Sequence, residues 1–333
     1  MTTANVTLIV DDQDARIQYL CPVTKETVSG SYFHDTWTSI GSLACGQNGW
    51  FKHTFNGTQT RIWGSASQIN NNYSVKIDDG AFVEQSGDGF YESPVLSDGL
   101  HTVVYAAGDE NLYPAFDYLT VIAGPSTQLL GRTVIVDDAE ISEYTGKWST
   151  QPLSEFLLAR PSSIYLNTTH WTNTVGDTFT FQFDGDSVAV SGLNSSAVYI
   201  LDGVSTVIPI PAATTYVQPM IQLFRADLEA GTHTLIFNVT EVAPSHVIGI
   251  DFVLYNSSVD SLPPASSTVQ SPTVASKKTN HTRIIVATTL GSLAAILLLA
   301  LFFFLRRTRV LKSKSTSTST AKWDIVTKVE AEK

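Results

Sequence analysis

Residues 177–190 read DTFTFQFDGDSVAV, and residues 49–57 read GWFKHTFNG. In both stretches an aromatic side chain occupies nearly every second position, which is typical of a strand with one buried face. Each run ends in a dipeptide that favours a tight turn, Asn56-Gly57 in one and Asp184-Gly185 in the other. The alternation then resumes in the residues that follow. We therefore predict a β-hairpin at each dipeptide.

These two stretches belong to an internal duplication of the first 256 residues. Six segments recur in the same order, at offsets between about 123 and 134 positions. The pairs are 10–12 and 136–138, 32–37 and 165–171, 49–57 and 177–185, 75–80 and 198–203, 99–105 and 231–237, and 115–121 and 249–255. They predict two copies of one fold, with a boundary at the turn-forming cluster Gly124-Pro125-Ser126.

Each copy is predicted to be all-β. Short strands recur about every ten residues between Gly, Asn and Asp, and no amphipathic helical pattern of useful length is present. About 125 residues of such strands favour a two-sheet sandwich of jelly-roll type. We expect copy 1 to cover residues 1–124 and copy 2 to cover residues 131–256.

Composition excludes several classes of protein. The 333 residues carry a net charge of −11, 43% are hydrophobic and only 15% are charged, so a disordered chain is excluded. Residues 1–256 hold about 9 Lys and Arg against about 27 Asp and Glu, and nucleic acid is therefore not an expected partner. Two cysteines are too few for a disulfide-rich mini-protein or a four-cysteine zinc site.

Residues 284–305, IIVATTLGSLAAILLLALFFFL, contain no charge. A helix of this length spans roughly 33 Å, enough to cross the lipid bilayer, so we predict one transmembrane α-helix here. Residues 257–283 are rich in Ser, Thr and Pro and are expected to form an extended stalk. Residues 306–333 are expected to form a basic cytoplasmic tail, because positive charges follow the predicted span.

Glycosylation sequons support the same orientation. They occur at Asn5, Asn56, Asn72, Asn167, Asn194, Asn238, Asn256 and Asn280, all before the predicted span. Roughly three would arise by chance, and a sequon is useful only on the lumenal side. We therefore expect a single-pass plasma-membrane protein with its N-terminal region outside.

The first residues, MTTANVTLIVDD, show no signal-peptide pattern. We expect a truncated gene model to account for this. Translocation driven by the span itself and a tail-anchored cytosolic protein are the two alternatives.

The order of motifs in each copy resembles a fungal family of basidiomycete type, largely uncharacterised, whose members are single-pass membrane proteins with tandem galactose-binding-like β-sandwiches. In copy 2 the resemblance rests on Gly185, on Leu201-Asp202-Gly203 and on the Leu228 to Leu235 segment. Copy 1 departs from the pattern after Tyr19, where Leu20-Cys21-Pro22 replaces a glycine-rich turn. The resemblance covers nearly the whole chain. It implies a fold and little about function.

Two sets of residues are candidates for covalent or metal chemistry. Cys21 and Cys45, both in copy 1, are expected to form one disulfide in an oxidising compartment. The resemblance implies that the first and last strands of each copy lie close together. It would then bring together Asp11, Asp12 and Asp117 in copy 1, and Asp137, Asp138 and Asp251 in copy 2. These oxygens suit calcium, while the favoured alternative is that each Asp caps a turn, which leaves the protein without a cofactor.

Tryptophans in polar, loop-like segments are the candidates for sugar binding, because indole faces stack on sugar rings. Trp37 lies beside His34 and Asp35, Trp171 lies beside His170, and Trp148 is the third candidate. Packing in the core or at its edge is the favoured alternative for each tryptophan taken singly, and Trp63, which follows Ile62 in a predicted strand, is expected to pack. His101 and His233 recur before strands, and a structural hydrogen bond is expected for both.

No catalytic constellation is recognisable in the sequence, and an enzyme is not expected. The sequence favours non-enzymatic recognition of cell-wall or extracellular glycans. A structural or adhesion spacer that contacts cell-surface proteins is the alternative, and a carbohydrate-active enzyme is the remote one.

Overall fold

The computed structural model describes residues 6–20, 25–27, 32–40, 49–65, 71–87, 90–107, 115–151, 164–193, 196–208, 221–242 and 247–262. The chain divides into two compact units, residues 1–266 and 267–333. All described residues belong to the first unit. Within them the secondary structure is strands and short 3-10 turns, so the all-β prediction is confirmed for this part of the chain.

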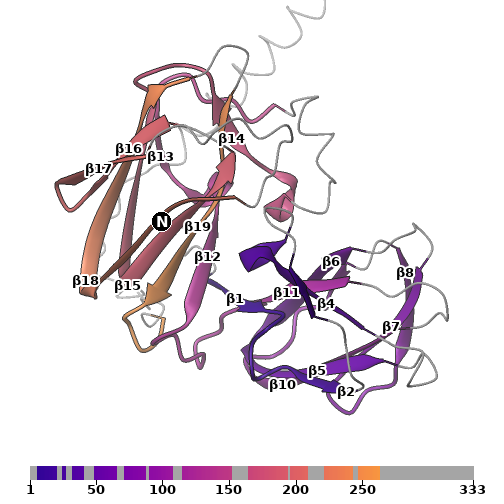
Figure 1. Cartoon of the computed structure of the whole chain (residues 1–333). Coiled ribbons are helices and arrows are strands. Elements are labelled where there is room, and N and C mark those ends of the chain that lie inside the picture. Colours follow the sequence, from indigo (N-terminus) through magenta and orange to yellow (C-terminus); the bar gives the residue numbers. More distant parts are fainter. Residues whose placement is uncertain are drawn as a thin grey trace, which may run out of the picture. The chain divides into compact units, whose positions relative to one another are not determined.

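Copy 1 is built from strands in two facing antiparallel layers (Figure 1). One layer has the order β2 (Gln18–Leu20), β5 (Trp50–Gly57), β10 (Gly99–Ala107), β7 (Asn71–Ile77) and β8 (Val83–Gly87). The other contains β1 (Thr7–Asp11), β11 (Ala115–Ile122), β6 (Gln59–Ser65), β9 (Tyr91–Glu92), β4 (Thr36–Ser39) and β3 (Lys25–Thr27). This arrangement is a β-sandwich.

The core of copy 1 lies between these layers. Phe51, Phe55 and Tyr105 come from the first layer and pack with Leu8 and Leu119 of the second. Their alternation with exposed neighbours follows the two-residue period of a strand. Each such side chain contributes roughly 1.5–3 kcal/mol on burial, so this packing holds the two layers together.

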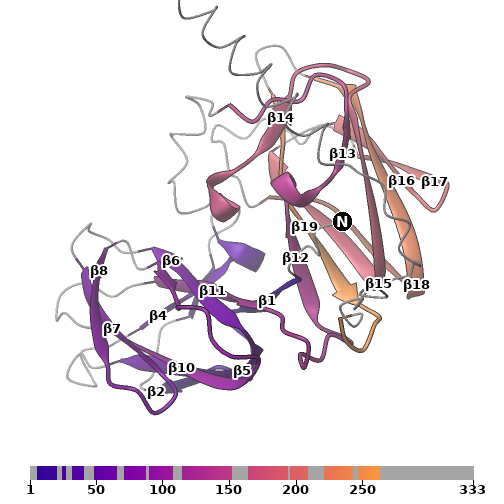
Figure 2. The same ribbon diagram turned by 180° about the vertical axis from the view of Figure 1, so that it is seen from behind.

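Copy 2 repeats the plan with longer strands. They are β12 (Thr133–Asp137), β13 (Glu143–Thr145), β14 (His170–Thr172), β15 (Thr178–Leu193), β16 (Ser196–Leu201), β17 (Val204–Ile208), β18 (Ile221–Glu241) and β19 (Ile248–Ser257). β15 and β18 run side by side in both views (Figures 1 and 2). Its core includes Phe179, Phe237, Tyr199 and Ile250, all almost fully buried.

The two predicted hairpins are wrong. β5 pairs with β10 and β2, whereas β6 pairs with β11 and β9, so the chain at Asn56-Gly57 passes from one layer to the other. In copy 2 the same passage lies inside β15, which pairs with β18 on both sides of Gly185 and with β19 only from Gly185 onward, and its register shifts just after Gly185. The dipeptides therefore mark a bend between layers.

The glycine at each bend is required by a close approach of two backbones. A Cβ on Gly57 would lie 2.6 Å from the Ile122 carbonyl oxygen, and a Cβ on Gly185 would lie 2.6 Å from the Asn256 carbonyl oxygen. Both distances are too short for a real contact. Glycine is the residue that allows such an approach.

The two copies share one continuous sheet and one of the three buried clusters. β1 pairs antiparallel with β12, and the pairing joins Leu8 to Val134. A third cluster of buried side chains crosses this junction. Its buried members are Ile9, Phe33, Trp63 and Tyr118 from copy 1 and Ile135, Tyr165, Ala189, Phe252 and Leu254 from copy 2. Trp63, which was expected to pack, is 7% exposed.

Several predicted features lie outside the described residues. They are Cys21 and Cys45, the sequons Asn5, Asn194 and Asn280, the predicted span 284–305, the tail 306–333 and most of the stalk. Within the residues that the structure does describe, no helix has the length and apolar character needed to cross a membrane.

Candidate functional site

A 3-10 turn at Phe33–Asp35 is the centre of the candidate site in copy 1. The Phe33 amide donates a hydrogen bond of 2.9 Å to the buried Asp117 carboxyl group. His34 and Asp35 in this turn have φ values of 50° and 62°. Left-handed backbone is costly for residues other than glycine, so the contact with Asp117 stabilises an otherwise unfavourable turn.

Asp11 and Asp12, at the end of β1, lie beside this turn. His34 Nδ1 is 2.7 Å from Asp11 Oδ2. The hydroxyl groups of Thr36 and Thr38 donate to the two oxygens of Asp12 at 2.7 and 2.5 Å. The structure therefore brings the predicted carboxylates together, and it occupies them with donors from β4 and the turn.

Copy 2 contains an equivalent turn at Tyr165–Asn167. The Tyr165 amide donates to Asp251 Oδ1 at 3.1 Å, as Phe33 does to its own partner in copy 1. Leu166 and Asn167 have φ values of 49° and 58°. Leu166 has the same left-handed backbone conformation as His34 at the equivalent position, so the backbone of this turn recurs although its side chains differ.

The carboxylates at the end of β12 also have protein partners. The Thr168 hydroxyl donates to Asp138 Oδ1 at 2.8 Å and to Asp137 at 3.1 Å. His170 Nδ1 is 2.6 Å from Asp138 Oδ2. Histidine thus contacts an aspartate in both copies, but from a different position of the chain in each.

Burial dominates the ionisation of these acids. It raises the pKa of Asp12 to about 6, against the hydrogen bonds from two threonines, and it raises the pKa of Asp137 to about 7, helped by the charge of Asp138. Burial also raises the pKa of Asp117 and Asp251 well above the usual range. Burial therefore disfavours the charged form of both carboxyl groups.

Calcium binding receives no support from this geometry. The predicted ligands were Asp11, Asp12 and Asp117 in copy 1 and Asp137, Asp138 and Asp251 in copy 2. Over the described ranges, no group of three or more His, Cys, Asp or Glu side chains could hold a metal ion. The hydrogen bonds above favour the alternative, in which these residues fix turns.

The two tryptophans that were matched in the sequence are not equivalent in the structure. Phe33 and Tyr165 hold the same place in the two turns, because the amide of each donates to a buried aspartate. Counted from that place, Trp37 corresponds to Thr169 and not to Trp171. The two copies therefore present different aromatic surfaces.

Trp171 lies on the short strand β14 and is partly exposed. Its Nε1 donates to the Gln151 carbonyl oxygen at 2.7 Å, which fixes the orientation of the ring. His170 precedes it in the strand and points to the opposite face, where it contacts Asp138. The predicted pairing of His170 with this indole in one sugar site is therefore not formed.

Trp37 is partly exposed on β4 and lies 5.8 Å from the ring of Tyr32. Its Nε1 is buried and has no hydrogen-bond partner among the described residues. His34 turns away toward Asp11, so it is not beside this indole either.

Trp148 packs at the edge of the copy 2 core. Its ring meets Tyr144 edge-on at 5.0 Å, and its Nε1 donates to the Thr178 carbonyl oxygen at 3.0 Å. Packing therefore accounts for this residue.

The structural role expected for the two recurring histidines is confirmed. His101 contacts Asp78 through Nδ1 at 2.8 Å and the Ser97 carbonyl through Nε2 at 2.7 Å. Two acceptors favour the doubly protonated ring, and the bond to Asp78 raises the pKa of His101. The same contacts recur at His233 with Asp202 and Glu229, at 2.5 and 2.9 Å.

The described sequons differ in accessibility. Asn167 is exposed in its turn. Asn56 exchanges hydrogen bonds with Ser126, and Asn256 Oδ1 accepts a hydrogen bond from Thr133 at 2.9 Å. Asn238 Oδ1 is buried without a partner in the described part of the chain. Asn72 lies on β7.

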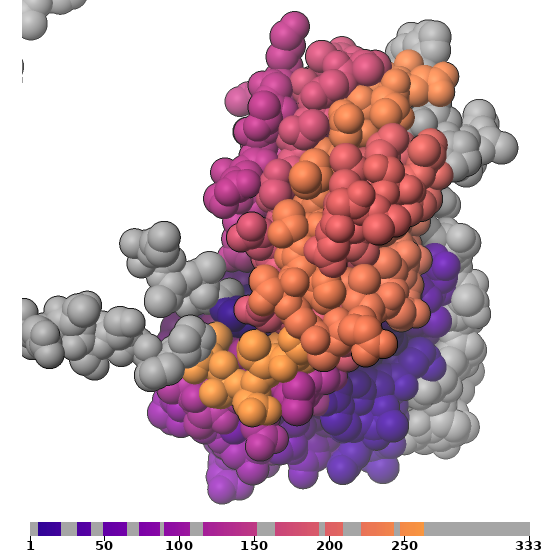
Figure 3. All heavy atoms as spheres, turned by 90° about the vertical axis from the view of Figure 1, so that its left-hand side faces the viewer, coloured from indigo at the N-terminus to yellow at the C-terminus, as the bar shows by residue number. Residues whose placement is uncertain are grey.

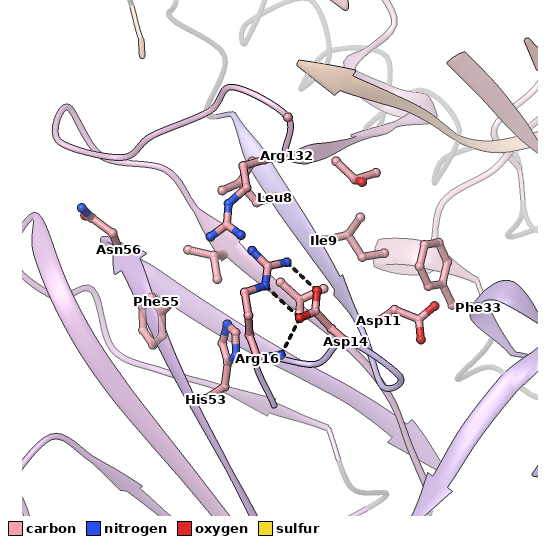
Figure 4. A pocket seen from close by; sticks show the side chains of 14 residues that line it. Leu8, Ile9, Asp11, Asp14, Arg16, Phe33, His53, Phe55, Asn56 and Arg132 are labelled. Carbon is pink, nitrogen blue, oxygen red and sulfur yellow. Dashed lines mark hydrogen bonds and ion pairs between the residues drawn. The ribbon is translucent and has the colours of Figure 1, made fainter. Parts of the chain in front are cut away.

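A cavity of about 120 Å³ was missed by the sequence analysis. It lies against β1, β5 and residues 131–133, and Figure 4 shows its lining. The polar side chains in it include Asp14, Arg16, His53 and Arg132. A signal was present: His53 stands in an alternating strand where copy 2 has Phe181.

Comparisons with known proteins are uninformative about function. No family model matches the chain, and no curated protein matches it. A family two carbohydrate esterase from Cellvibrio japonicus is 16% identical over 35% of this chain and 34% of its own, with a TM-score of 0.30. The chain therefore spans about a third of that protein.

Two further structures align over more of the chain. A tandem CBM22 domain from Paenibacillus barcinonensis Xyn10C is 10% identical over 78% of this chain and 100% of its own, with a TM-score of 0.25. The insecticidal crystal protein Cry2Aa is 8% identical over 76% and 51%, with a TM-score of 0.30. Similarities this low carry no inference about what the chain binds.

Proposed function

We propose that this chain is a non-enzymatic recognition protein of the cell surface and that its ligands are glycans. The observation that carries the proposal is the indole of Trp171, which is partly exposed and held by its bond to Gln151. A sugar ring stacks on an indole through its apolar C–H face. An indole already fixed in place loses little conformational freedom when the sugar binds.

The proposal includes membrane display. The apolar segment 284–305 would be the anchor, the basic residues after it would face the cytosol, and the Ser/Thr/Pro-rich residues 257–283 would raise the sandwiches above the lipid. The jelly-roll and galactose-binding-like assignment of each copy is part of the same proposal.

Glycan binding is tested with the purified full-length chain in detergent against a panel of cell-wall polysaccharides and glycans. Trp171→Ala is expected to weaken binding at least tenfold, and Trp37→Ala reports whether the second indole also contributes. Phe82→Ala is the matched control, since Phe82 is an aromatic residue of copy 1 that is 53% exposed. Binding that survives Trp171→Ala, or is lost equally in the control, contradicts this site.

Protein adhesion is the second candidate, and one observation favours it. Val204 and Val207 on the edge strand β17 are 70% and 66% exposed. Figure 3 shows the red segment of β16 and β17 at the surface beside the orange β18. An exposed edge strand can pair with another chain. A folded protein that binds no glycan, but whose capture of a cell-surface protein is lost in Val204→Lys, would support this candidate.

A further inference from the structure

The cavity on β1 and β5 is lined by two arginines, Arg16 and Arg132, and by two aspartates, Asp11 and Asp14. Arg16 donates from Nε and Nη2 to the Asp14 carboxylate at 2.8 and 2.5 Å. Arg132 makes no ion pair within the described residues, and Figure 4 shows its guanidinium group pointing toward that of Arg16. The other nearby acid, Asp11, is paired with His34. Of the two facing guanidinium groups, only that of Arg16 has a carboxylate partner among the described residues, so an anion can bind at Arg132.

A second group in the cavity is buried without a partner. His53 is 1% exposed, and its Nδ1 has no hydrogen bond among the described residues. The ring also bonds the backbone of Arg16, and the orphan Nδ1 leaves Nε2 for that bond. Burial, together with the charge of Arg16, lowers the pKa of His53 to about 4. The ring is therefore neutral at pH 7, and Nδ1 can accept a hydrogen bond from a hydroxyl group.

The duplicated fold supplies an internal comparison. Counted along equivalent strands, Phe181 takes the place of His53 and Val6 that of Arg132. Arg16, two residues before Gln18, corresponds to Ile141, two residues before Glu143. The same position in copy 2 thus lacks both guanidinium groups and the imidazole. A buried orphan nitrogen costs roughly 1–3 kcal/mol, which the phenylalanine of copy 2 does not incur. The fold itself therefore does not require this polar set.

From this geometry we infer that the cavity binds a small hydroxycarboxylate, with its carboxylate between Arg16 and Arg132 and its hydroxyl group donating to His53 Nδ1. A volume of about 120 Å³ suits a ligand of about five heavy atoms, since a cavity of about 150 Å³ holds benzene. The anion is either a free hydroxy acid or the carboxylate end of an acidic sugar. This site uses neither Trp37 nor Trp171, so it stands or fails independently of the proposed glycan surface.

The test is calorimetric titration of the full-length chain with glycolate, acetate and glucuronate. Glycolate is expected to bind more tightly than acetate, which lacks the hydroxyl group. Arg132→Gln should weaken glycolate binding at least tenfold, because it removes the half-exposed cation. Arg225→Gln is the matched control, since Arg225 is also at the surface, where it pairs with Asp227.

His53→Phe copies the residue of copy 2 and separates the two parts of the site. It should retain carboxylate binding, abolish the preference for glycolate over acetate, and raise the melting temperature of the free protein. If glucuronate binds at least as tightly as glycolate, the ligand is the carboxylate end of an acidic sugar. If glycolate binds and glucuronate does not, the ligand is a free hydroxy acid. Absence of binding by all three to the folded wild type, or equal binding by wild type and Arg132→Gln, overturns the inference.

Discussion

The bend of β15 between the two layers predicts opposite effects of two glycine substitutions that face each other. Gly185 and Gly231 are partners in the register of β15 and β18. A Cβ on Gly185 would lie 2.6 Å from the Asn256 carbonyl oxygen, whereas a Cβ on Gly231 would meet only the His233 Nε2 at 3.8 Å. Gly185→Ala should therefore destabilise the protein, and Gly231→Ala should not.

The magnitudes decide the sign in each case. Ordinary Cβ contacts begin near 3.4 Å, so Gly185→Ala requires a shift of about 0.8 Å in the backbone of β19. Overpacking of this kind costs about 1–3 kcal/mol. Reduced entropy of the unfolded chain returns only about 0.4–1 kcal/mol. For Gly231→Ala the added Cβ meets no close neighbour, so the reduced entropy of the unfolded chain acts without an overpacking cost.

Thermal unfolding followed by circular dichroism measures both variants. The net cost is at most about 2.6 kcal/mol, so at about 2–4 °C per kcal/mol for a unit of this size Gly185→Ala should lower the melting temperature by up to about 10 °C. Gly231→Ala should leave it unchanged or raise it slightly. Equal melting temperatures for the two variants would refute the close approach of β15 to β19 and with it the explanation of the bend.

Three further predictions concern ionisation, glycosylation and the shared core. His233→Gln should destabilise the protein most between about pH 4 and 6.5, as melting temperatures measured across pH would show. The pKa of His233 is raised in the folded protein, so its stabilisation is complete below about pH 6.5 and is lost as pH rises through the folded pKa. The pKa of Asp202 is lowered, so the stabilisation by the pair is also lost when pH falls far enough to protonate Asp202. Glycopeptide mapping should find Asn167 occupied and Asn238 unoccupied, because the Asn238 side-chain oxygen is buried, and a glycan on Asn238 would contradict the register of β18. Phe252→Ala should cost about 3–5 kcal/mol in urea unfolding and still give a single transition, since Phe252 is 1% exposed in the core that both copies share, and two separate transitions would refute that shared core.

The strands were predictable because their signal is local. The alternation around Phe179 and Phe55 depends on the two-residue period of a strand, and the structure places both side chains in cores. Pairing depends on contacts far apart in sequence. Asn56-Gly57 has the local chemistry of a hairpin, yet its glycine is needed for the approach to Ile122, which lies 65 positions further along the chain and leaves no mark near the dipeptide.

Side-chain placement at the candidate site was less predictable for the same reason. His170 and Trp171 are neighbours in sequence, but a strand sends them to opposite faces. The cavity was missed because Arg132 and His53 come from distant segments. Its one local trace is the histidine in an otherwise aromatic row, and the comparison with Phe181 could have revealed it.

The junction between β1 and β12 has a symmetry that bears on the origin of the chain. Leu8 and Val134, which face each other there, are the same residue of the repeated unit. Ile9 with Ile135, and Tyr118 with Phe252, are likewise equivalent members of the shared core. An interface in which equivalent residues meet is what a two-fold axis produces in a homodimer. The duplication therefore has the form of such a dimer made covalent, in which the connection between the copies replaces a concentration-dependent equilibrium by a permanent one.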